Sequence, residues 1–191
     1  MTLRTLNSLS LSLALALVVA LGACASEPET PPVAADTSLS APAILLHLTA
    51  VPAVFEVETN DEEGLSLSAA SLPGPSSVGI TLGEYEPGGI NIFERVEEQL
   101  ASFTELPGGS SFGQTQLVAP IGLTFMLRGR YTDGDQELEE LRAILVHPAG
   151  NRLLTASYSY PVGDDTTERG QQLMELLGEM EPIEEEESPQ A

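Results

Sequence analysis

The chain has 191 residues, and its 29 Asp and Glu against 7 Lys and Arg give a formal net charge of −22 at pH 7. All seven basic residues are arginines. Proteins bind phosphate backbones through Lys and Arg, so this balance argues against nucleic acid and anionic lipid surfaces as partners. Two interpretations of the acidic surface stay open: solubility in salty surroundings, or an acidic docking surface.

The first 23 residues have the three parts of an export signal. Arg4 is the only charge, and the apolar stretch from Leu9 to Leu21 is too short for a comfortable membrane span. The stretch leads into the tetrapeptide Leu21-Gly22-Ala23-Cys24, which contains the only cysteine of the chain. This tetrapeptide resembles the lipobox of bacterial lipoproteins.

The lipobox resemblance implies cleavage between Ala23 and Cys24 and acylation of Cys24 on its sulfur and its new amino group. Several acyl chains hold a protein firmly on a membrane, whereas one anchors it only marginally. Acylation also removes the problem of a lone free thiol in an exported protein. Residue 25 is Ala and not Asp, and by resemblance to enteric-type sorting this implies the outer membrane, facing the periplasm. The alternative is an ordinary signal peptide cut near Ala23 or Ala25.

Residues 24–43 are rich in Pro, Ala, Ser and Thr and show no hydrophobic period. Such a stretch cannot bury enough apolar area to offset its ordering entropy. We therefore expect a disordered tether over residues 24–43. A folded domain is expected over residues 44–181, followed by a disordered acidic tail over residues 182–191.

The first half of the domain predicts strands and one helix. Runs of apolar and alternating residues mark four expected strands: residues 44–48, 53–58, 65–72 and 78–82. The first two are expected to pair or to run on, and the turn from Asn60 to Gly64 follows them. The helix is predicted by an apolar stripe at helical spacing: Ile90, Phe93, Val96, Leu100 and Phe103. Asn91 and Glu94 predict a start resembling a capping box.

The second half predicts a β-meander and a closing helix. The expected strands are residues 113–119, 123–131, 138–147 and 153–160. Asp133-Gly134 is a strong hairpin signal, because both residue types tolerate positive φ. The early glutamates of the third strand also suit a helix, but its β-branched end and the following turn favour a strand. The last helix runs from about Thr166 to Met180, with Asp165 as its N-cap.

This order predicts an α+β domain, with an antiparallel sheet of about six to seven strands and two amphipathic helices packed on it. Over residues 44–181 the order resembles the Mog1/PsbP-like domains, which include the DcrB-type envelope lipoproteins. The resemblance rests on VGITLGEY followed by INIFERVEEQLASF, on the hairpin QLVAPIGLTFMLRGRY, and on the pair RAILVHPAGNRLLTASYSYP. Members of this fold act as binding or assembly modules, so the resemblance implies such a role and transfers no functional residue.

Four arginines are the candidate site for an anionic ligand or an acidic partner segment: Arg128, Arg130, Arg142 and Arg152. The first two lie two residues apart on one expected strand and therefore share a face, and the others can lie near them across the sheet. Arginine binds carboxylates and phosphates through charge-assisted hydrogen bonds. The alternative is that the arginines neutralise neighbouring glutamates: Glu137, Glu139 and Glu140.

Other candidates for chemistry have plainer interpretations. His47 and His147 suit a metal pair or a general base, but zinc needs three or four ligands, so solvated strand-end histidines are the simpler expectation. The acidic cluster from Asp133 to Glu140 suits calcium, yet its glycine directly follows the first Asp instead of occupying the sixth loop position. The chain has no G-x-S-x-G elbow and no phosphate-binding loop. We therefore expect no catalytic residue, no metal and no cofactor.

The leading hypothesis is a non-enzymatic, lipid-anchored envelope protein whose domain binds another envelope protein or supports an assembly. The second is a periplasmic module that binds or senses a small ligand through a concave sheet face and the arginines, and the third is a hydrolase. A protein binder should show an exposed apolar patch or an unpaired sheet edge. A ligand binder should show a closed, mostly apolar pocket, and an enzyme should show titratable residues converging in such a pocket.

Overall fold

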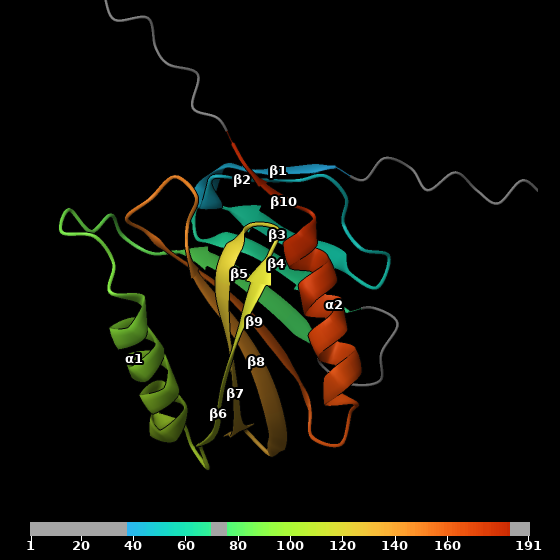
Figure 1. The fold of residues 1–191 in the computed structure, drawn as a ribbon. Coiled ribbons are helices and arrows are strands. Elements are labelled where there is room, and N and C mark those ends of the chain that lie inside the picture. The colour runs from blue at the N-terminus through green and yellow to red at the C-terminus, as the bar shows by residue number, and fades with distance from the viewer. Residues whose placement is uncertain (1–37, 70–75, 184–191) are drawn as a thin grey trace, which may run out of the picture. The chain divides into compact units, whose positions relative to one another are not determined.

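The computed structural model describes residues 38–69 and 76–183. The export signal, its cleavage site at Ala23 and Cys24, and the acidic residues from 184 onward lie outside the described residues. The predictions of cleavage, lipidation and membrane anchoring therefore stay predictions. The described part contains two antiparallel sheets and two α-helices (Figure 1).

The larger sheet has seven strands in the order β3-β4-β5-β9-β8-β7-β6, and every neighbouring pair is antiparallel. Its strands are β3 (Glu56–Asp61), β4 (Gly64–Ser68), β5 (Ser77–Leu82), β6 (Ser110–Ala119), β7 (Gly122–Asp133), β8 (Gln136–Val146) and β9 (Leu153–Pro161). Strands β6 to β9 form the predicted meander, and Gly134 takes a φ of 59° in the expected hairpin turn. The predicted α+β class and antiparallel sheet are confirmed.

A three-stranded sheet lies at one end of the molecule and corrects the predicted start of the domain. It consists of β1 (Leu39–Ala41), β2 (Leu46–Leu48) and β10 (Met180–Pro182), with β2 in the middle. A short 3-10 helix, η1 (Pro42–Ile44), joins the first two strands. The folded part thus reaches at least to Leu39, inside the range expected as tether, because the fully buried Ala41 belongs to the core. Residues 44–48 and 53–58 were expected to pair or to run on. Strand β2 pairs instead with β1 and β10.

The two helices pack on opposite faces of the large sheet. Helix α2 (Thr166–Gly178) begins as predicted, because the Asp165 carboxylate accepts hydrogen bonds from the backbone N–H groups of Thr167 and Glu168. Helix α1 (Ile92–Glu105) begins after Asn91, but no side-chain bond caps it. The Asn91 amide instead donates to the Glu94 carboxylate at 3.4 Å. The expected capping box at α1 is therefore wrong.

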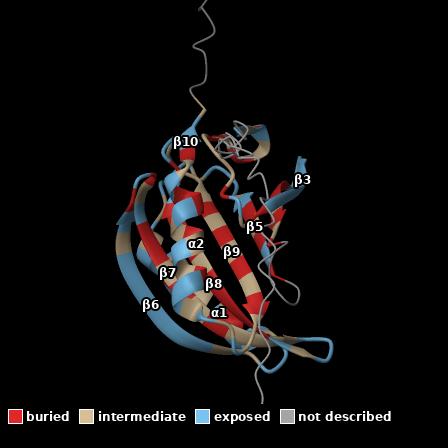
Figure 2. Cartoon of the chain, turned by 90° about the vertical axis from the view of Figure 1, so that its right-hand side faces the viewer, coloured by how far each residue is buried: buried red, intermediate tan, exposed pale blue. Residues whose placement is uncertain are grey.

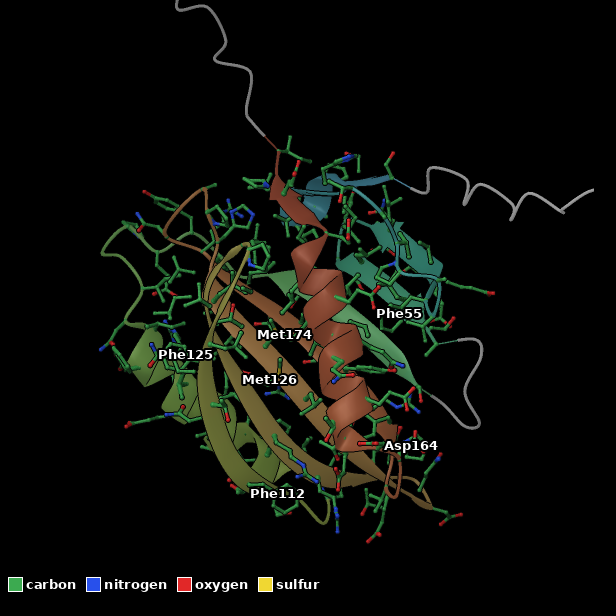
Figure 3. All side chains as sticks on the ribbon, turned by 45° about the vertical axis from the view of Figure 1, so that its right-hand side comes forward. Phe55, Phe112, Phe125, Met126, Asp164 and Met174 are labelled. Atoms are coloured by element: carbon green, nitrogen blue, oxygen red, sulfur yellow. The ribbon has the colours of Figure 1, made fainter. Side chains whose placement is uncertain are left out.

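Each helix covers its own core. The larger core lies under α2 and includes the fully buried Tyr158, Leu173 and Leu177. The smaller core lies under α1 and consists of five buried residues: Val96, Phe103, Phe125, Leu127 and Ile144. Successive side chains of β7 point to opposite faces of the sheet, so Phe125 packs in the core under α1 and Met126 packs against the core under α2 (Figure 3).

Candidate functional site

Two of the four candidate arginines meet at a single carboxylate on the α2 face. Arg128 and Arg130 lie on β7, and Glu139 lies opposite Arg130 in the ladder with β8. Arg128 Nη2 donates to one oxygen of Glu139 at 2.8 Å, and Arg130 Nη2 donates to the other at 2.7 Å. The Thr166 hydroxyl adds a bond of 3.2 Å from the first turn of α2. This cluster therefore ties the sheet to the start of α2.

The environment of Glu139 keeps it ionised. Burial disfavours its charged form, but the hydrogen bonds from Arg130 and Arg128 outweigh burial and lower the pKa of the carboxyl. The two arginine side chains are 42% and 38% exposed. The Phe112 ring centre lies 5.2 and 5.4 Å from their guanidinium carbons, at the distance of a cation–π contact. One side of the cluster is thus open to solvent.

The other two arginines lie elsewhere, so the four do not form the patch that was expected. Arg142 lies opposite Leu127 in the β7–β8 ladder and therefore shares the α1 face. It pairs with Glu140 at 2.8 Å, and α1 supplies the further acceptors Gln99 and Ser102. Arg152 lies in the turn between β8 and β9. Strand alternation places Arg142 on the opposite face from Arg128 and Arg130. The alternative of neutralised glutamates holds for Arg128, Arg130 and Arg142.

The histidines and the acidic cluster do not assemble a site. His47 lies on β2, and His147 is buried at the end of β8, where its Nδ1 accepts a bond from the backbone N–H of Ala149 at 3.0 Å. Glu139 and Glu140 of the acidic cluster face opposite sides of the sheet, and each is paired with arginine. Within residues 38–69 and 76–183, no three His, Asp or Glu side chains are placed to bind a metal.

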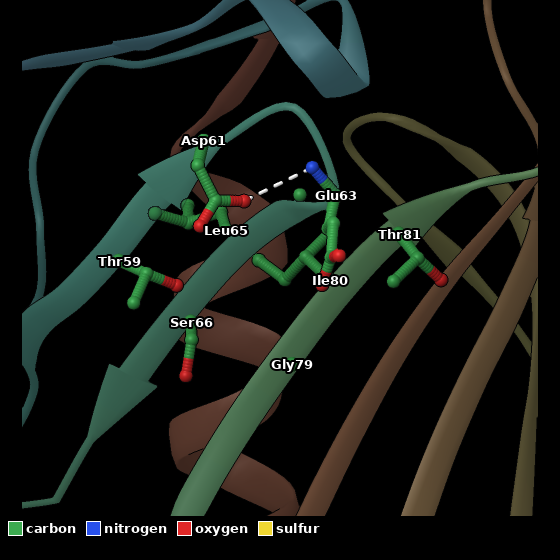
Figure 4. Close-up of a pocket in the computed structure, with 9 residues that line it drawn as sticks. Thr59, Asp61, Glu63, Leu65, Ser66, Gly79, Ile80 and Thr81 are labelled. Carbon is green, nitrogen blue, oxygen red and sulfur yellow. Dashed lines mark hydrogen bonds between the residues drawn. The ribbon is translucent and has the colours of Figure 1, made fainter.

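A hollow of about 270 Å³ lies over strands β3 to β5, on the face opposite α2 (Figure 4). Hydroxyl and acidic side chains line it, among them Thr59, Asp61, Ser66 and Thr81. The Asp61 carboxylate accepts a bond of 2.9 Å from the backbone N–H of Glu63, which fixes the turn above the hollow. The hollow is open to solvent and therefore differs from the closed pocket that a small-ligand binder should show, and the arginines lie outside it.

Four exposed hydrophobic side chains gather on the α1 face, and we call them the apolar surface: Phe93, Val118, Leu123 and Val146. They are 62%, 81%, 45% and 36% exposed, respectively. Val118 lies directly opposite Leu123 in the β6–β7 ladder. Leu123 and Val146 are the next residues beyond the last pair of the β7–β8 ladder, Thr124 and Leu145. The Phe93 ring packs edge-on against Phe125, with centroids 5.6 Å apart. Together they form a row across three strands, with an aromatic ring from α1 beside it.

Sequence reasoning missed the apolar surface. Phe93 belongs to the apolar stripe that predicts α1, and Val118 and Leu123 were assigned only to expected strands. The one available signal was that Val118 and Leu123 flank the turn residues 120–121 symmetrically. Their pairing brings two apolar side chains to the same face, but their exposure depends on where α1 lies on the sheet, which periodicity does not give.

The apolar surface borders the edge strand β6. This strand runs along one side of the sheet and is exposed over most of its length (Figure 2). Its ten residues, SSFGQTQLVA, contain no charged side chain and no proline. Long exposed edges of this kind are templates for pairing with another chain, and proteins usually protect them with charges or proline.

No known protein family and no curated protein matches this sequence. Among solved structures, the chain is similar to the Ran-binding protein Mog1p of Saccharomyces cerevisiae, with a TM-score of 0.54, 11% identity, and coverage of 76% of this chain and 94% of that one. It is similar to the cyanobacterial PsbP of Synechocystis sp. PCC 6803, with a TM-score of 0.52, 9% identity, and coverage of 85% and 98%.

A third similar structure is LpqN of Mycobacterium tuberculosis, which is described as involved in cell envelope biogenesis. Its TM-score is 0.50 at 14% identity, and the match covers 72% of this chain and 83% of LpqN. These similarities show that the domain has the Mog1/PsbP-like α+β fold. Among the helices that the structure describes, none is long and apolar enough to cross a membrane.

Proposed function

We propose that the chain is a lipid-anchored module of the bacterial cell envelope, without catalytic activity, that binds another envelope protein through the apolar surface. The observation that carries the binding role is this row of exposed Val118, Leu123 and Val146, with Phe93 beside it. Contiguous exposed apolar patches are characteristic of interaction sites. In a chain with a net charge of −22, an uncharged strand and an apolar row side by side stand out from the rest of the surface.

Support for the envelope location comes from the sequence. The export signal, the lipobox-like tetrapeptide ending at Cys24 and the Pro- and Ala-rich stretch after it are the parts that an acyl-anchored protein needs. LpqN, which has a similar fold, is described as involved in cell envelope biogenesis, and Mog1p is described as a Ran-binding protein. The first description is consistent with an envelope location, and the second with a binding module on this fold.

The binding role is tested by placing a photoreactive amino acid at Leu123 of the full-length protein in its own cells. We expect one discrete cross-linked species at Leu123, and its loss when Phe93→Asp is added. The matched control is the same amino acid at Val57, which is 43% exposed on the opposite edge of the sheet. Absence of cross-linking at Leu123, or an identical pattern at Val57, would refute binding through the apolar surface.

The anchor is tested separately by Cys24→Ser. The substitution removes the acylated sulfur, so the protein should move from the membrane fraction to the soluble fraction. A second variant, Ala25→Asp, should move the protein from the outer to the inner membrane in a cell with enteric-type sorting. If Cys24→Ser leaves the membrane-bound amount unchanged, acyl anchoring is wrong.

The second candidate function, a module that binds or senses a small anion, has one observation in its favour. Arg128 and Arg130 share a single carboxylate, and both remain partly exposed beside Phe112. Phosphate or citrate at millimolar concentration should then raise the melting temperature, and Arg130→Gln should abolish the rise. Arg152→Gln is the control. No change in melting temperature with either anion would rule out this function.

A further inference from the structure

The two edges of the large sheet differ in ways that bear on pairing. Strand β3 is short, carries Glu56, Glu58 and Asp61, and has a register irregularity between Val57 and Thr59. These features discourage an additional strand. Strand β6 has ten residues and no charge, and its one irregularity lies near its start, between Ser111 and Gly113.

The remaining stretch of β6, Gly113–Ala119, keeps an unbroken antiparallel register with β7. In the part of the chain that the structure describes, β7 is the only strand to which β6 is hydrogen-bonded, so the other edge of β6 is unpaired. An antiparallel strand turns the N–H and C=O groups of alternate residues toward each side. Every second residue of this stretch therefore presents its backbone donor and acceptor outward, ready to pair with an extended chain.

The side chains beside this edge define what an added strand would contact. Gln114, Gln116 and Val118 lie on the α1 face of β6. On the same face, Leu123 of β7 and then Val146 of β8 lie further into the sheet from Val118. A strand placed beside β6 puts alternate side chains on the same face. Its apolar residues would then extend the apolar surface by one further strand and bury the exposed Val118. Such cross-strand contacts between side chains would stabilise the added strand.

Charge limits the partner. Helix α1 on the same face exposes Glu94, Glu97 and Glu98, and the whole chain has a net charge of −22. A second copy would bring the same negative charge, and its approach would be opposed over the range of screened electrostatics. A partner segment with Lys or Arg beside its apolar residues is attracted instead, and complementary charge also speeds association.

We propose that β6 accepts an extended segment of another protein by strand addition, and that this segment alternates apolar residues and carries Lys or Arg at its ends. The inference rests on the protein-binding part of the proposed function. Main-chain hydrogen bonds along Gly113–Ala119 supply affinity, and the apolar surface selects the side chains on the α1 face, as in other cases of recognition at a sheet edge.

The test uses the full-length protein in detergent with a synthetic peptide that alternates Val and Thr and has Lys at both ends. Hydrogen exchange of residues 110–119 should slow by about tenfold or more when the peptide binds, because the outward amides become hydrogen-bonded. Val118→Lys should remove this protection, because a lysine on an edge strand blocks pairing and repels the peptide. Val57→Lys on β3 is the matched control and should leave the protection intact.

A peptide with Glu at both ends is the charge control and should protect residues 110–119 at least about tenfold less, owing to repulsion by the acidic chain. Equal protection by both peptides overturns the basic character of the partner. No protection by either peptide, while cross-linking at Leu123 persists, overturns strand addition and leaves the proposed function standing. Protection that depends on protein concentration without peptide, with a doubled mass in solution, assigns the edge to a second copy and overturns the proposal.

Discussion

The two faces of the large sheet are covered to different extents by their helices. On the α2 face, Leu173, Leu176 and Leu177 seal a continuous core that runs from β4 to β8 and into the small sheet. On the α1 face, the helix packs mainly on β7, β6 and β8, and it buries Val96 and Phe103. The hollow over β3 to β5 and the apolar surface both lie on this second face. The α2 face holds the fold together, and the α1 face retains surface for binding.

Truncating Phe103 should give the largest loss of unfolding free energy, and it should best distinguish the stability of the two cores. The ring is fully buried in the small α1 core, and Phe→Ala at such a site costs about 3–5 kcal/mol of unfolding free energy. We expect urea denaturation to report this loss for Phe103→Ala, and hydrogen exchange to show early opening of α1 while α2 remains protected. If α2 opens together with α1, the two cores form a single cooperative unit and the contrast between the faces fails.

Gly129 offers a sharper test of the same contact. A Cβ built on Gly129 would lie 2.3 Å from the Phe103 ring, because the ring packs directly on the backbone of β7. Gly129→Ala should therefore destabilise the protein by about 1–3 kcal/mol through overpacking. In the double variant Phe103→Ala, Gly129→Ala, the second substitution should cost little, because the ring is gone. Additive losses in denaturation would contradict the proposed steric contact.

The sequence predicts the local elements of this fold better than its long-range pairings. Alternation and the Asp133-Gly134 turn identify the meander from β6 to β9, and Asp165 marks the start of α2. Strand β1 has three residues in a Pro- and Ala-rich stretch, so its composition hides it. Strand β2 pairs with β10, which lies more than 130 residues away in the chain. No periodicity in either segment specifies such a partner.

The candidate site shows the same limit. Residues two apart on a strand share a face, so the neighbouring positions of Arg128 and Arg130 follow from the sequence. Whether Arg142 joins them depends on the register between β7 and β8, which sets it opposite Leu127. The exposure of Phe93 depends on how far α1 reaches over the sheet. Register and helix position are tertiary properties, and the periodic patterns that identify strands and helices do not contain them.

Glu139→Gln tests how much the ion-pair cluster of Glu139, Arg128 and Arg130 on the α2 face contributes to stability. The substitution removes the charge that Arg128 and Arg130 share, and hydrogen bonds to charged groups contribute about 1.5–3 kcal/mol. We expect the lower end of that range, because both arginines can turn to water. Since the pKa of Glu139 is lowered on folding, its contribution is present above its ordinary value of 4.5 and is lost as the pH falls through the folded value. The wild type and the variant should therefore converge below pH 4.5, which denaturation across pH 3–7 measures.

The smallest expected effect concerns His147, at the junction between β8 and the segment that carries η1. Burial lowers the pKa of this imidazole below its ordinary 6.5, and the charge of Arg152 acts in the same direction, while the backbone of Leu45 and Ile44 partly opposes the shift. The unfolded chain therefore binds a proton more readily than the folded one, and stability should fall as the pH drops below 6.5. One proton limits this slope to about 1.4 kcal/mol per pH unit.

His147→Gln should reduce that slope between pH 6.5 and 5 and leave it unchanged between pH 7.5 and 8.5, where the imidazole is neutral in both states. The slope is measured by urea denaturation at each pH, so a general loss of stability in the variant does not affect the comparison. A slope that is as steep in the variant as in the wild type would assign the acid sensitivity to other groups. A reduced slope would assign the acid sensitivity to proton uptake by His147 on unfolding.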